Sequence, residues 1–468
     1  MGRRSAFVGL TLHTTPPLPS CNKALLDKKI ATSGWGLYPL VAASVQRARY
    51  LSDLGRAAAA PILPQGNCRS YGDACLYERV VSTLPLKHLL AFDPQRGLLR
   101  AQAGITFAEI IRFVLPQGFF PPVTPGTKFP TLGGCIAADV HGKNHHAEGS
   151  IAAFVESLDM VLADGSTVRC SRNEYADLFW ATLGGMGLTG FIYAATLRLK
   201  KVPSAYIRQR TIKTANWAET CRVCMETQHE YTYSVAWIDG LQTGRKLGRG
   251  HVLLGEHADA RALKGKSPFA IHGEGRWAVP FFLPGGVLNA KSLKVFNALY
   301  YHRQVRRVAD AFVHYDPYFY PLDAIRGWNR LYGRRGFLQY QIAVPYADGA
   351  EVIADLLGRI AREGVASPLA VLKTFGPPSE GLLSFPIAGY TLALDIPLRD
   401  SGTIPFLRAL NKTIVEAKGR VYLAKDAILE REDFAAMYPQ LRQFKAVKRK
   451  YDPECRFRSC LSDRLGIT

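Results

Sequence analysis

The sequence lacks any uninterrupted apolar run of about 18 residues, the length that a membrane-spanning helix requires. It also lacks helix-turn-helix, zinc-finger and RNA-recognition signatures, so nucleic acid is not expected as a partner. Two arginines near the start precede only a short apolar stretch and then Pro16-Pro17, which makes a poor signal peptide. Contact with a membrane is therefore expected to be peripheral.

Cysteine is too sparse for a disulfide scaffold, because nine residues, an odd number, are spread over 468 positions. This pattern favours reduced thiols in a cytosolic protein. Cys221 and Cys224 have C-x-x-C spacing, but they lie in a stretch of helical character with no second pair nearby. A redox or metal-binding role for that pair is disfavoured.

Acidic residues are few relative to basic ones, with 38 Asp and Glu against 59 Lys and Arg and a net charge of +21. Such a charge suits anionic lipid headgroups or a phosphate-bearing substrate. It is also compatible with an ordinary solvated surface, or with a non-catalytic binder of anionic polymers. The charge alone does not separate these interpretations.

The chain is longer than one hydrophobic core usually organises, which predicts two domains. Before residue 200, short strands alternate with glycine turns, and Asp164-Gly165 predicts a hairpin. A helix is predicted between Thr106 as the N-cap and Gly118 as the stop. After Lys200, strands of period two and helices followed by glycine predict an antiparallel sheet with helices on one face. The fold class is therefore α+β.

The stretch from Asp259 to Arg307 has no clear period and is predicted to be a long irregular loop. It carries Trp277, Phe281 and Phe282 together with nearby basic residues. This composition suits a segment that touches a membrane or covers a site. The alternative is a loop whose aromatic side chains pack on its own domain.

Two glycine-rich segments are candidates for phosphate binding. Gly185 to Gly190 match G-x-G-x-x-G, but a helical stretch precedes them and a strand follows, so the dinucleotide-binding interpretation fails. Gly66 to Asp73, "GNCRSYGD", lie between short strand-like stretches. Small residues there allow backbone N–H groups to converge on a pyrophosphate, although a simple tight turn is the alternative.

Four segments in this order are similar to the vanillyl-alcohol-oxidase-type family of FAD-linked oxidases: "GNCRSYGDACL", "VTPGTKFPTLGGCIAADVHGKNHH", "DLFWATLGGMGLTGFI" and "DPECRF". The resemblance implies a two-lobed FAD-binding domain with an inserted substrate domain. The implied boundaries are a flexible extension over 1–30, a first FAD-binding part over 31–200, a substrate domain over 201–418 with a loop at about 259–307, and a completing part over 419–468.

The resemblance also implies the residues of the site and a non-covalently held FAD. Catalytic roles fall to Lys425, His141 and Tyr71. Substrate-binding roles fall to Lys143, Gln339, Gln341 and Lys373. The implied cofactor-binding residues are Gly66, Asn67, Cys68, Arg69, Ser70, Tyr71, Gly72, Asp73, Gly126, Thr131, Leu132, Gly133, Gly134, Ala138, Asp139, His141, Ile192 and Tyr422.

Metal ligation by His141, His145 and His146 is disfavoured, because no glutamate stands between them as in H-E-x-x-H and helical geometry after Gly142 is doubtful. Lys425 is expected to stabilise developing negative charge or to take part in proton transfer. The alternative is a surface lysine that pairs with Asp426.

The pattern most resembles family members that oxidise the 2-hydroxyl of a polyprenylphosphoryl-β-D-ribose to the 2-keto sugar, the first half of an epimerisation to arabinose for envelope glycans. A short-chain NAD(P)H-dependent reductase is then expected to act next. The implied place is the cytoplasmic face of the inner membrane, with peripheral contact to anionic lipid. The alternative substrate is a soluble sugar, aldonolactone or polyol.

Overall fold

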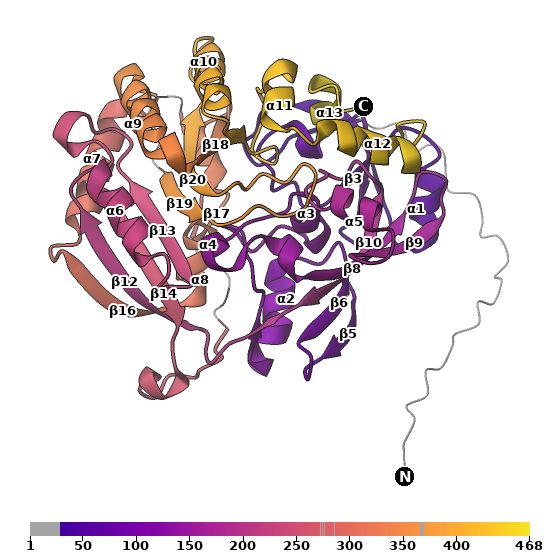
Figure 1. Ribbon diagram of the computed structural model, residues 1–468, viewed down its shortest axis with the longest axis horizontal. Coiled ribbons are helices and arrows are strands. Elements are labelled where there is room, and N and C mark those ends of the chain that lie inside the picture. Colours follow the sequence, from indigo (N-terminus) through magenta and orange to yellow (C-terminus); the bar gives the residue numbers. More distant parts are fainter. Residues whose placement is uncertain (1–28, 272, 274, 276, 285, 366–368) are drawn as a thin grey trace.

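The computed structural model describes residues 29–468, except 272, 274, 276, 285 and 366–368. The predicted α+β class is confirmed. Figure 1 shows the N-terminal strands and the last helices on one side of the molecule and a large sheet covered by helices on the other. Most of the predicted extension over 1–30 lies outside the described residues. Within the described part of the chain, no helix is both long and apolar enough to cross a bilayer.

Three main sheets organise the molecule, with strand orders β1-β2-β4-β3, β5-β6-β10-β8-β9 and β16-β12-β14-β13-β19-β20-β18-β21. The strands are β1 (Ile30–Thr32), β2 (Val41–Arg47), β3 (Leu63–Gln65), β4 (Arg79–Ser82), β5 (Leu89–Asp93), β6 (Leu98–Gln102), β7 (Phe119–Phe120), β8 (Val155–Val161), β9 (Thr167–Ser171), β10 (Phe191–Arg198), β11 (Lys200–Lys201), β12 (Tyr206–Thr214), β13 (Tyr233–Ile238), β14 (Gly250–His257), β15 (Trp277–Ala278), β16 (Val308–His314), β17 (Ile325–Arg326), β18 (Phe337–Pro345), β19 (Ala370–Phe375), β20 (Gly389–Pro397) and β21 (Arg420–Val421). The helices are α1 (Leu51–Ala57), α2 (Phe107–Val114), α3 (Leu132–Ala137), α4 (His145–Glu148), α5 (Ala176–Thr182), α6 (Trp217–Thr227), α7 (Ala290–His302), α8 (Tyr315–Phe319), α9 (Tyr346–Glu363), α10 (Thr403–Glu416), α11 (Arg431–Met437), α12 (Leu441–Tyr451) and α13 (Cys460–Arg464).

Local signals that the sequence carries are confirmed in the first two sheets. The Thr106 side chain accepts from the backbone N–H of Glu109, whose carboxylate accepts from the Thr106 N–H in return, so α2 begins with a capping box. Gly118 has φ +80° after the short 3₁₀ turn that follows α2. β8 and β9 pair antiparallel through a turn in which Gly165 has φ +84°.

The G-x-G-x-x-G segment lies between helix α5 and strand β10, as expected from its context. Gly187 has φ +78° and Gly190 has φ +150°, which explains the glycines without a dinucleotide fold. The segment turns the chain from α5 back into the middle of the five-stranded sheet.

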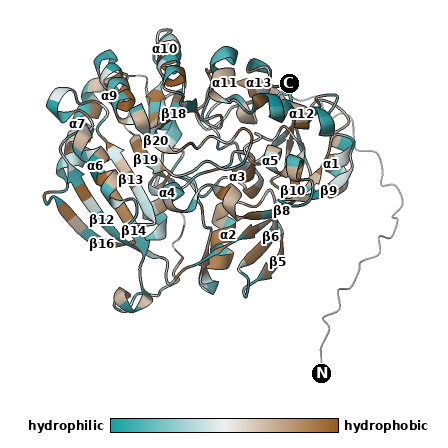
Figure 2. Cartoon of the chain, in the orientation of Figure 1, coloured by the Kyte–Doolittle hydropathy of each residue, from teal (hydrophilic) through white to brown (hydrophobic). Residues whose placement is uncertain are grey.

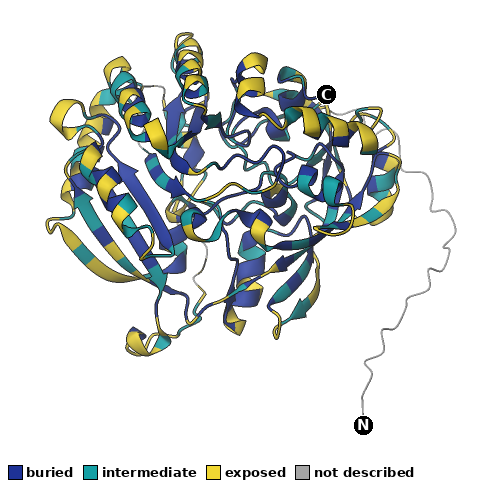
Figure 3. Ribbon diagram, in the orientation of Figure 1, coloured by how far each residue is buried: buried dark blue, intermediate teal, exposed yellow. Residues whose placement is uncertain are grey.

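The eight-stranded sheet is antiparallel and carries α6, α9 and α10 on one face (Figure 1), as predicted. Figure 2 shows both hydrophilic and hydrophobic residues on α9 and α10, and the buried residues of α9 are Gly349, Ile353, Leu356, Leu357 and Ile360. The strands differ from the half-buried ones that period two predicts. β18 is buried along almost its whole length, whereas the edge strand β16 is largely exposed (Figure 3). β18 is buried on both faces because its second face turns toward the N-terminal part of the chain.

The stretch over 259–307 is not wholly irregular, which corrects the sequence interpretation. It contains α7, which begins at a capping box formed by Asn289 and Ser292. Trp277 and Ala278 form β15, which pairs in parallel with β17. The periodicity of α7 was missed because its apolar residues Val295, Phe296 and Leu299 face solvent rather than a core.

The end of the chain packs on its beginning. The N–H of Ile62 donates to the Arg456 carbonyl at 2.7 Å, and the N–H of Arg458 donates to the Ile62 carbonyl at 3.0 Å. The buried Lys448 of α12 donates to the Leu188 carbonyl at 2.9 Å. These contacts place the yellow helices beside the purple strands in Figure 1.

Candidate active site

A cavity of about 550 Å³ lies where the large sheet faces the N-terminal part of the chain. Its wall is built by the loop of residues 66–71, the segment 125–141, the turn 186–192, the segment 322–328, strands β18 to β20, and residues 422–425. A cavity of this size, lined by apolar groups and a few polar ones, is typical of a site for a cofactor or small molecule.

The loop 66–75 is fastened to the segment that carries Lys425. The Tyr71 N–H donates to the Ala424 carbonyl at 3.0 Å. A Cβ atom on Gly72 would stand 1.6 Å from the Asp426 carbonyl oxygen, so no other residue fits that approach. Arg464 adds a bridge, since its guanidinium donates to Asp73 and to Asp426 at 2.8 Å each. These contacts therefore fix the loop 66–75 in position relative to the segment that carries Lys425.

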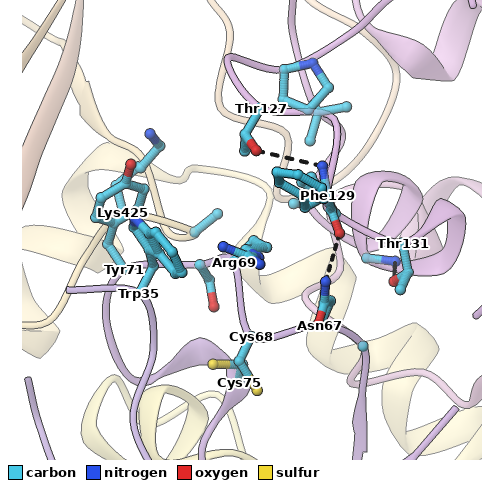
Figure 4. A pocket seen from close by; sticks show the side chains of 18 of the residues that line it. Trp35, Asn67, Cys68, Arg69, Tyr71, Cys75, Thr127, Phe129, Thr131 and Lys425 are labelled. Carbon is cyan, nitrogen blue, oxygen red and sulfur yellow. Dashed lines mark hydrogen bonds between the residues drawn. The ribbon is translucent and has the colours of Figure 1, made fainter. Parts of the chain in front are cut away.

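Aromatic rings and a guanidinium form the end of the cavity shown in Figure 4. The Arg69 guanidinium lies over the Trp35 ring at 4.1 Å and near the Phe129 ring at 5.1 Å. Its Nε is buried and has no hydrogen-bond partner among the described residues. Asn67 donates to the Phe129 carbonyl at 2.9 Å, which fixes the loop against the segment 125–131.

Two lysines, Lys425 and Lys373, also line the cavity, and Lys425 lies beside Tyr71 in Figure 4. The Lys425 ammonium lies 4.3 Å from the Tyr71 ring centroid, and burial lowers the Lys425 pKa to about 8. Burial, with smaller effects of Lys425 and Lys143, lowers the Lys373 pKa to about 7. Both side chains keep some accessible surface because they line the cavity. Lys425 does not pair with Asp426, whose carboxylate instead accepts from Arg464 and from the N–H groups of residues 428 and 429.

Hydrogen bonds fix the protonation of His141. The Thr391 hydroxyl donates to the Ile342 carbonyl at 2.8 Å, so its oxygen accepts from the Gln341 amide nitrogen at 3.1 Å. The same nitrogen donates to His141 Nε2 at 3.0 Å, which places the ring proton on Nδ1. Burial, followed by the charge of Lys373, keeps the His141 pKa well below its usual range. His141 is therefore a neutral donor.

Gln339 is held by a buried carboxylate on the neighbouring strand. Its amide nitrogen donates to Asp395 at 2.5 Å, and Tyr332 donates to the other carboxylate oxygen at 3.1 Å. Burial raises the Asp395 pKa to about 6. Gln339 and Gln341 both line the cavity, as their alternation on β18 predicts.

Most of the predicted site residues line this one cavity. They are Gly66, Asn67, Cys68, Arg69, Ser70, Tyr71, Gly126, Thr131, Gly133, Gly134, Ala138, His141, Ile192, Gln339, Gln341, Lys373, Tyr422 and Lys425. Tyr422 also donates to the Ala138 carbonyl at 2.9 Å, so it joins the C-terminal segment to the wall built by α3.

Five predicted residues do not lie on the cavity wall. Gly72 packs against the Asp426 carbonyl, and Asp73 pairs with Arg464. Leu132 is fully buried in the core, and the Asp139 carboxylate accepts from Ser379, Ser384 and the Ala152 N–H. The Lys143 ammonium turns to the Tyr318 carbonyl and lies 4.4 Å from the Tyr318 ring, while burial lowers its pKa to about 7. These residues are used in packing, ion pairs or hydrogen bonds away from the cavity instead.

The remaining histidines and the C-x-x-C pair have other partners. His145 Nδ1 accepts from the Gly376 N–H at 3.2 Å, and His146 Nε2 lies 2.9 Å from the Tyr231 carbonyl. Cys221 and Cys224 are buried in α6, and burial raises the pKa of each thiol to about 12. Burial of this kind favours packing roles over reactivity.

Sequence reasoning missed several residues of the wall. Trp35 and Trp328 form an edge-on pair with centroids 5.8 Å apart, and Asp323 and Arg326 lie in the same region. The segment 322–328 has no regular period, and its only sequence signal is a Gly-Trp pair followed by basic residues. Its place at the cavity depends on tertiary contacts that no local pattern encodes.

The cavity suits FAD, the cofactor that the sequence resemblance implies. Arg69 Nε and His141 Nδ1 are buried donors at the wall that lack hydrogen-bond acceptors within the described chain. A Cβ on Gly126 or Gly187 would meet no atom within 4 Å, so open space adjoins both glycines. Flat aromatic groups, a cation and glycine backbone are the features that a dinucleotide with a planar ring needs.

Two known families match the chain. The family described as "FAD binding domain" matches residues 40–171, and the family described as "D-arabinono-1,4-lactone oxidase" matches residues 334–465. The first match covers the loop 66–71 and the segment 125–141, and the second covers β18 to β20 and Lys425. These parts of the cavity wall therefore lie within the regions that match an FAD-binding family and an oxidase family.

Curated relatives extend the likeness to most of the chain. Decaprenylphosphoryl-beta-D-ribose oxidase of Mycolicibacterium smegmatis is 33% identical over 413 residues, 87% of this chain and 89% of that protein. An uncharacterised protein of Streptomyces coelicolor, in the mprA 5′ region, is 34% identical over 78% of this chain and 100% of its own length. Delta(24)-sterol reductase of Homo sapiens is 31% identical over 114 residues, 24% of this chain and 22% of that protein.

Proposed function

Because the chain belongs to the family of FAD-linked oxidases that includes decaprenylphosphoryl-β-D-ribose oxidase, we propose that it oxidises a polyprenylphosphoryl-β-D-ribose. The chain is an FAD-dependent oxidoreductase. The proposed reaction converts the sugar 2-hydroxyl to the 2-keto sugar. The observation that carries this proposal is that two half-buried lysines, Lys425 and Lys373, line the same cavity as the loop 66–71.

In an alcohol oxidation, different residues of the cavity accept the proton, orient polar groups and exclude water. FAD held by the loop 66–71 and the segment 125–141 would supply the electron acceptor for oxidation of the sugar carbon. Lys425 takes the hydroxyl proton, because a pKa of about 8 leaves part of the amine neutral near neutral pH. His141 Nδ1 and the Gln341 amide orient polar groups from the opposite wall, since the hydrogen bonds among Thr391, Gln341 and His141 fix their donors. Tyr422 and Phe385, stacked with centroids 4.6 Å apart, help to exclude water.

Lys373 suits the phosphate of the substrate. Burial and Lys425 destabilise its charge in the free protein, and a phosphate group beside it reverses that effect by pairing with the ammonium. The phosphate of the substrate therefore stabilises the charged form of Lys373, to which it binds. A neutral sugar lacks this contribution.

A second candidate substrate is a soluble aldonolactone or sugar. The observation in its favour is that the D-arabinono-1,4-lactone oxidase family matches the part of the chain that carries Gln339, Gln341 and Lys425. The two candidates differ in the need for a phosphate-binding cation, which Lys373 provides.

The test is an anaerobic visible spectrum of the purified holoenzyme before and after a short-chain polyprenylphosphoryl ribose is added. The expected result is bleaching of the oxidised flavin band, because the sugar carbon delivers its hydride. The matched controls are the same polyprenyl phosphate without ribose and D-arabinono-1,4-lactone. Bleaching by the lactone alone contradicts the lipid-linked substrate.

The mouth of the cavity is the exposed part of its wall at Ile325 and Arg326. It suits contact with an anionic membrane, and we include such contact in the proposal. Trp277 and Phe281 are 76% and 63% exposed, and Trp277 pairs with Ile325, a residue of the cavity wall. Arg326 and Arg330 are exposed in the same region, and the Arg330 guanidinium lies 5.9 Å from the Phe282 ring. Aromatic rings beside arginines favour the lipid interface. A prenyl chain then stays in the bilayer while its sugar phosphate enters the cavity.

The double substitution of Trp277→Glu and Phe281→Glu is expected to lower binding to anionic liposomes at least about tenfold, since two interfacial aromatics are lost and two acids gained. Co-sedimentation at low salt measures it. KM should rise for a long-chain substrate in vesicles and stay unchanged for a short-chain one. Leu299→Glu on α7, 69% exposed and distant from β17 in Figure 1, is the control. Equal loss of binding in both variants contradicts the assignment of the mouth.

The product of the proposed reaction defines the next step. A 2-keto sugar is returned to an alcohol of the opposite configuration by hydride delivery to the other face of the carbonyl. We propose a short-chain NAD(P)H-dependent reductase as the protein that performs this reduction. Together the two enzymes would invert the sugar at that carbon.

A further inference from the structure

Two cysteines stand together in the loop that lines the cofactor end of the cavity. Cys68 and Cys75 are both on the cavity wall, and both are free thiols that are partly exposed. Figure 4 shows their sulfur atoms beside one another below Arg69 and Tyr71. The Gln65 amide donates to the Cys75 carbonyl at 2.8 Å and holds that end of the loop in place. Neither thiol has a part in the proposed oxidation.

The pKa values of the two thiols are shifted in opposite directions. The neighbouring Cys75 thiol is the largest influence that lowers the Cys68 pKa, and the Arg69 charge adds to it, although burial opposes both. The Cys75 pKa is raised well above its usual range, first by the neighbouring Cys68 and then by burial. Cys68 is therefore the nucleophile and Cys75 the protonated partner, the arrangement of a peroxide-sensitive pair.

The backbone at Cys68 has a conformation that side chains seldom adopt. Cys68 has φ +47°, in the left-handed region that favours glycine. A side chain there costs on the order of 1 kcal/mol relative to glycine. The thiol is kept at this position despite that cost.

We propose that Cys68 and Cys75 form an oxidation site at which hydrogen peroxide produces a reversible disulfide in the cofactor loop. The Cys68 thiolate attacks one peroxide oxygen and the O–O bond breaks, which gives a sulfenic acid and water. The Cys75 thiol then attacks the sulfenic sulfur, and the S–O bond breaks with loss of a second water. In total, two thiols are oxidised and one peroxide is reduced to two waters.

The disulfide would close a loop of eight residues that contains Arg69 and Tyr71. The Arg69 guanidinium lies over the Trp35 ring and the Lys425 ammonium lies over the Tyr71 ring, so a covalent closure acts on residues of the cavity wall. A cross-link disfavours opened states of the loop more than the closed state. The oxidised holoenzyme is therefore expected to release FAD several-fold more slowly than the reduced one.

The test treats the purified holoenzyme with hydrogen peroxide, alkylates the remaining thiols, and identifies digested peptides by mass spectrometry. The expected product is a peptide linked between Cys68 and Cys75 that dithiothreitol releases. Loss of free Cys68 should be about tenfold faster than loss of Cys460, a partly exposed thiol whose pKa burial raises to about 11. FAD fluorescence after dilution measures the release rate.

Two variants separate the proposed roles. Cys75→Ser should leave Cys68 as a sulfenic acid that dimedone traps, because no resolving thiol remains. Cys68→Ser should leave Cys75 unmodified, because the Cys75 pKa is raised well above its usual range and no Cys68 sulfenic acid remains for it to attack. Sulfinic acid at Cys68 without a cross-link in the unmodified chain, or equal loss of Cys460, overturns the proposal.

Discussion

Substitution of Lys425 by methionine is expected to lower kcat by about 10² to 10⁴-fold, the usual contribution of a positioned general base. Methionine keeps the length and apolar stem of the lysine but offers no amine for the hydroxyl proton. The flavin spectrum should remain, because the Lys425 side chain contacts the Tyr71 ring and carries no hydrogen bond that holds the loop 66–71. Stopped-flow reduction of the flavin under anaerobic conditions measures the effect directly.

An arginine at the same position distinguishes the two roles that the sequence leaves open for Lys425. Lys425→Arg keeps a positive charge but cannot accept a proton near neutral pH. We expect no rescue of kcat. Recovery to within about threefold of the unsubstituted enzyme would contradict the base and favour charge stabilisation. Lys87→Met, which removes an exposed lysine paired with Glu109, is the control and should be neutral.

The pH profile gives an independent check of the same role. Burial lowers the Lys425 pKa to about 8, so the neutral, proton-accepting form increases as the pH rises through that value. At saturating substrate, where the bound phosphate keeps Lys373 charged, kcat should therefore rise from pH 6.5 to about 9. A cationic role predicts the opposite slope.

Elements set by local chemistry were predictable from the sequence. The capping box of Thr106 and Glu109 and the turn at Gly165 involve residues within four positions of each other, so their signals are complete in a short window. The prediction that Gln339 and Gln341 share one face of β18 is also confirmed, because alternate residues of a strand point to the same side. Which face lines a cavity depends on the rest of the fold, and the family resemblance supplied that information.

Two predicted site residues, Lys143 and Asp139, do not line the cavity, because their side chains bind groups in other segments of the chain. Lys143 is close in sequence to His141, yet its ammonium turns to the Tyr318 carbonyl on α8, 175 positions away. Asp139 caps the N–H of Ala152 and accepts from Ser379 and Ser384, although its motif is typical of cofactor contact. A motif specifies a neighbourhood, whereas the orientation of each side chain depends on distant segments that satisfy its charge.

Arg464→Met is expected to lower the free energy of unfolding by about 3 to 5 kcal/mol, the usual cost of leaving a buried ion pair without one partner. Arg464 bridges Asp73 in the cofactor loop and Asp426 beside Lys425, and the two carboxylates are 6% and 0% exposed. Burial raises the Asp73 pKa even though Arg464 opposes that effect, so the site tolerates the charge poorly without its partner. Urea unfolding of the holoenzyme measures the loss, and FAD release should accelerate with it.

Arg458→Met is the matched control, because Arg458 pairs with Asp463 at 2.9 Å where both side chains are more than a third exposed. It should cost less than about 1 kcal/mol. Adding Asp73→Asn to Arg464→Met should restore part of the stability, since one unpaired carboxylate is neutralised. Equal effects of Arg464→Met and Arg458→Met would mean that the bridge does not hold the two walls together. A large, partly rescued effect would instead identify the C-terminal helix α13 as the element that joins the cofactor loop to the segment of the catalytic lysine.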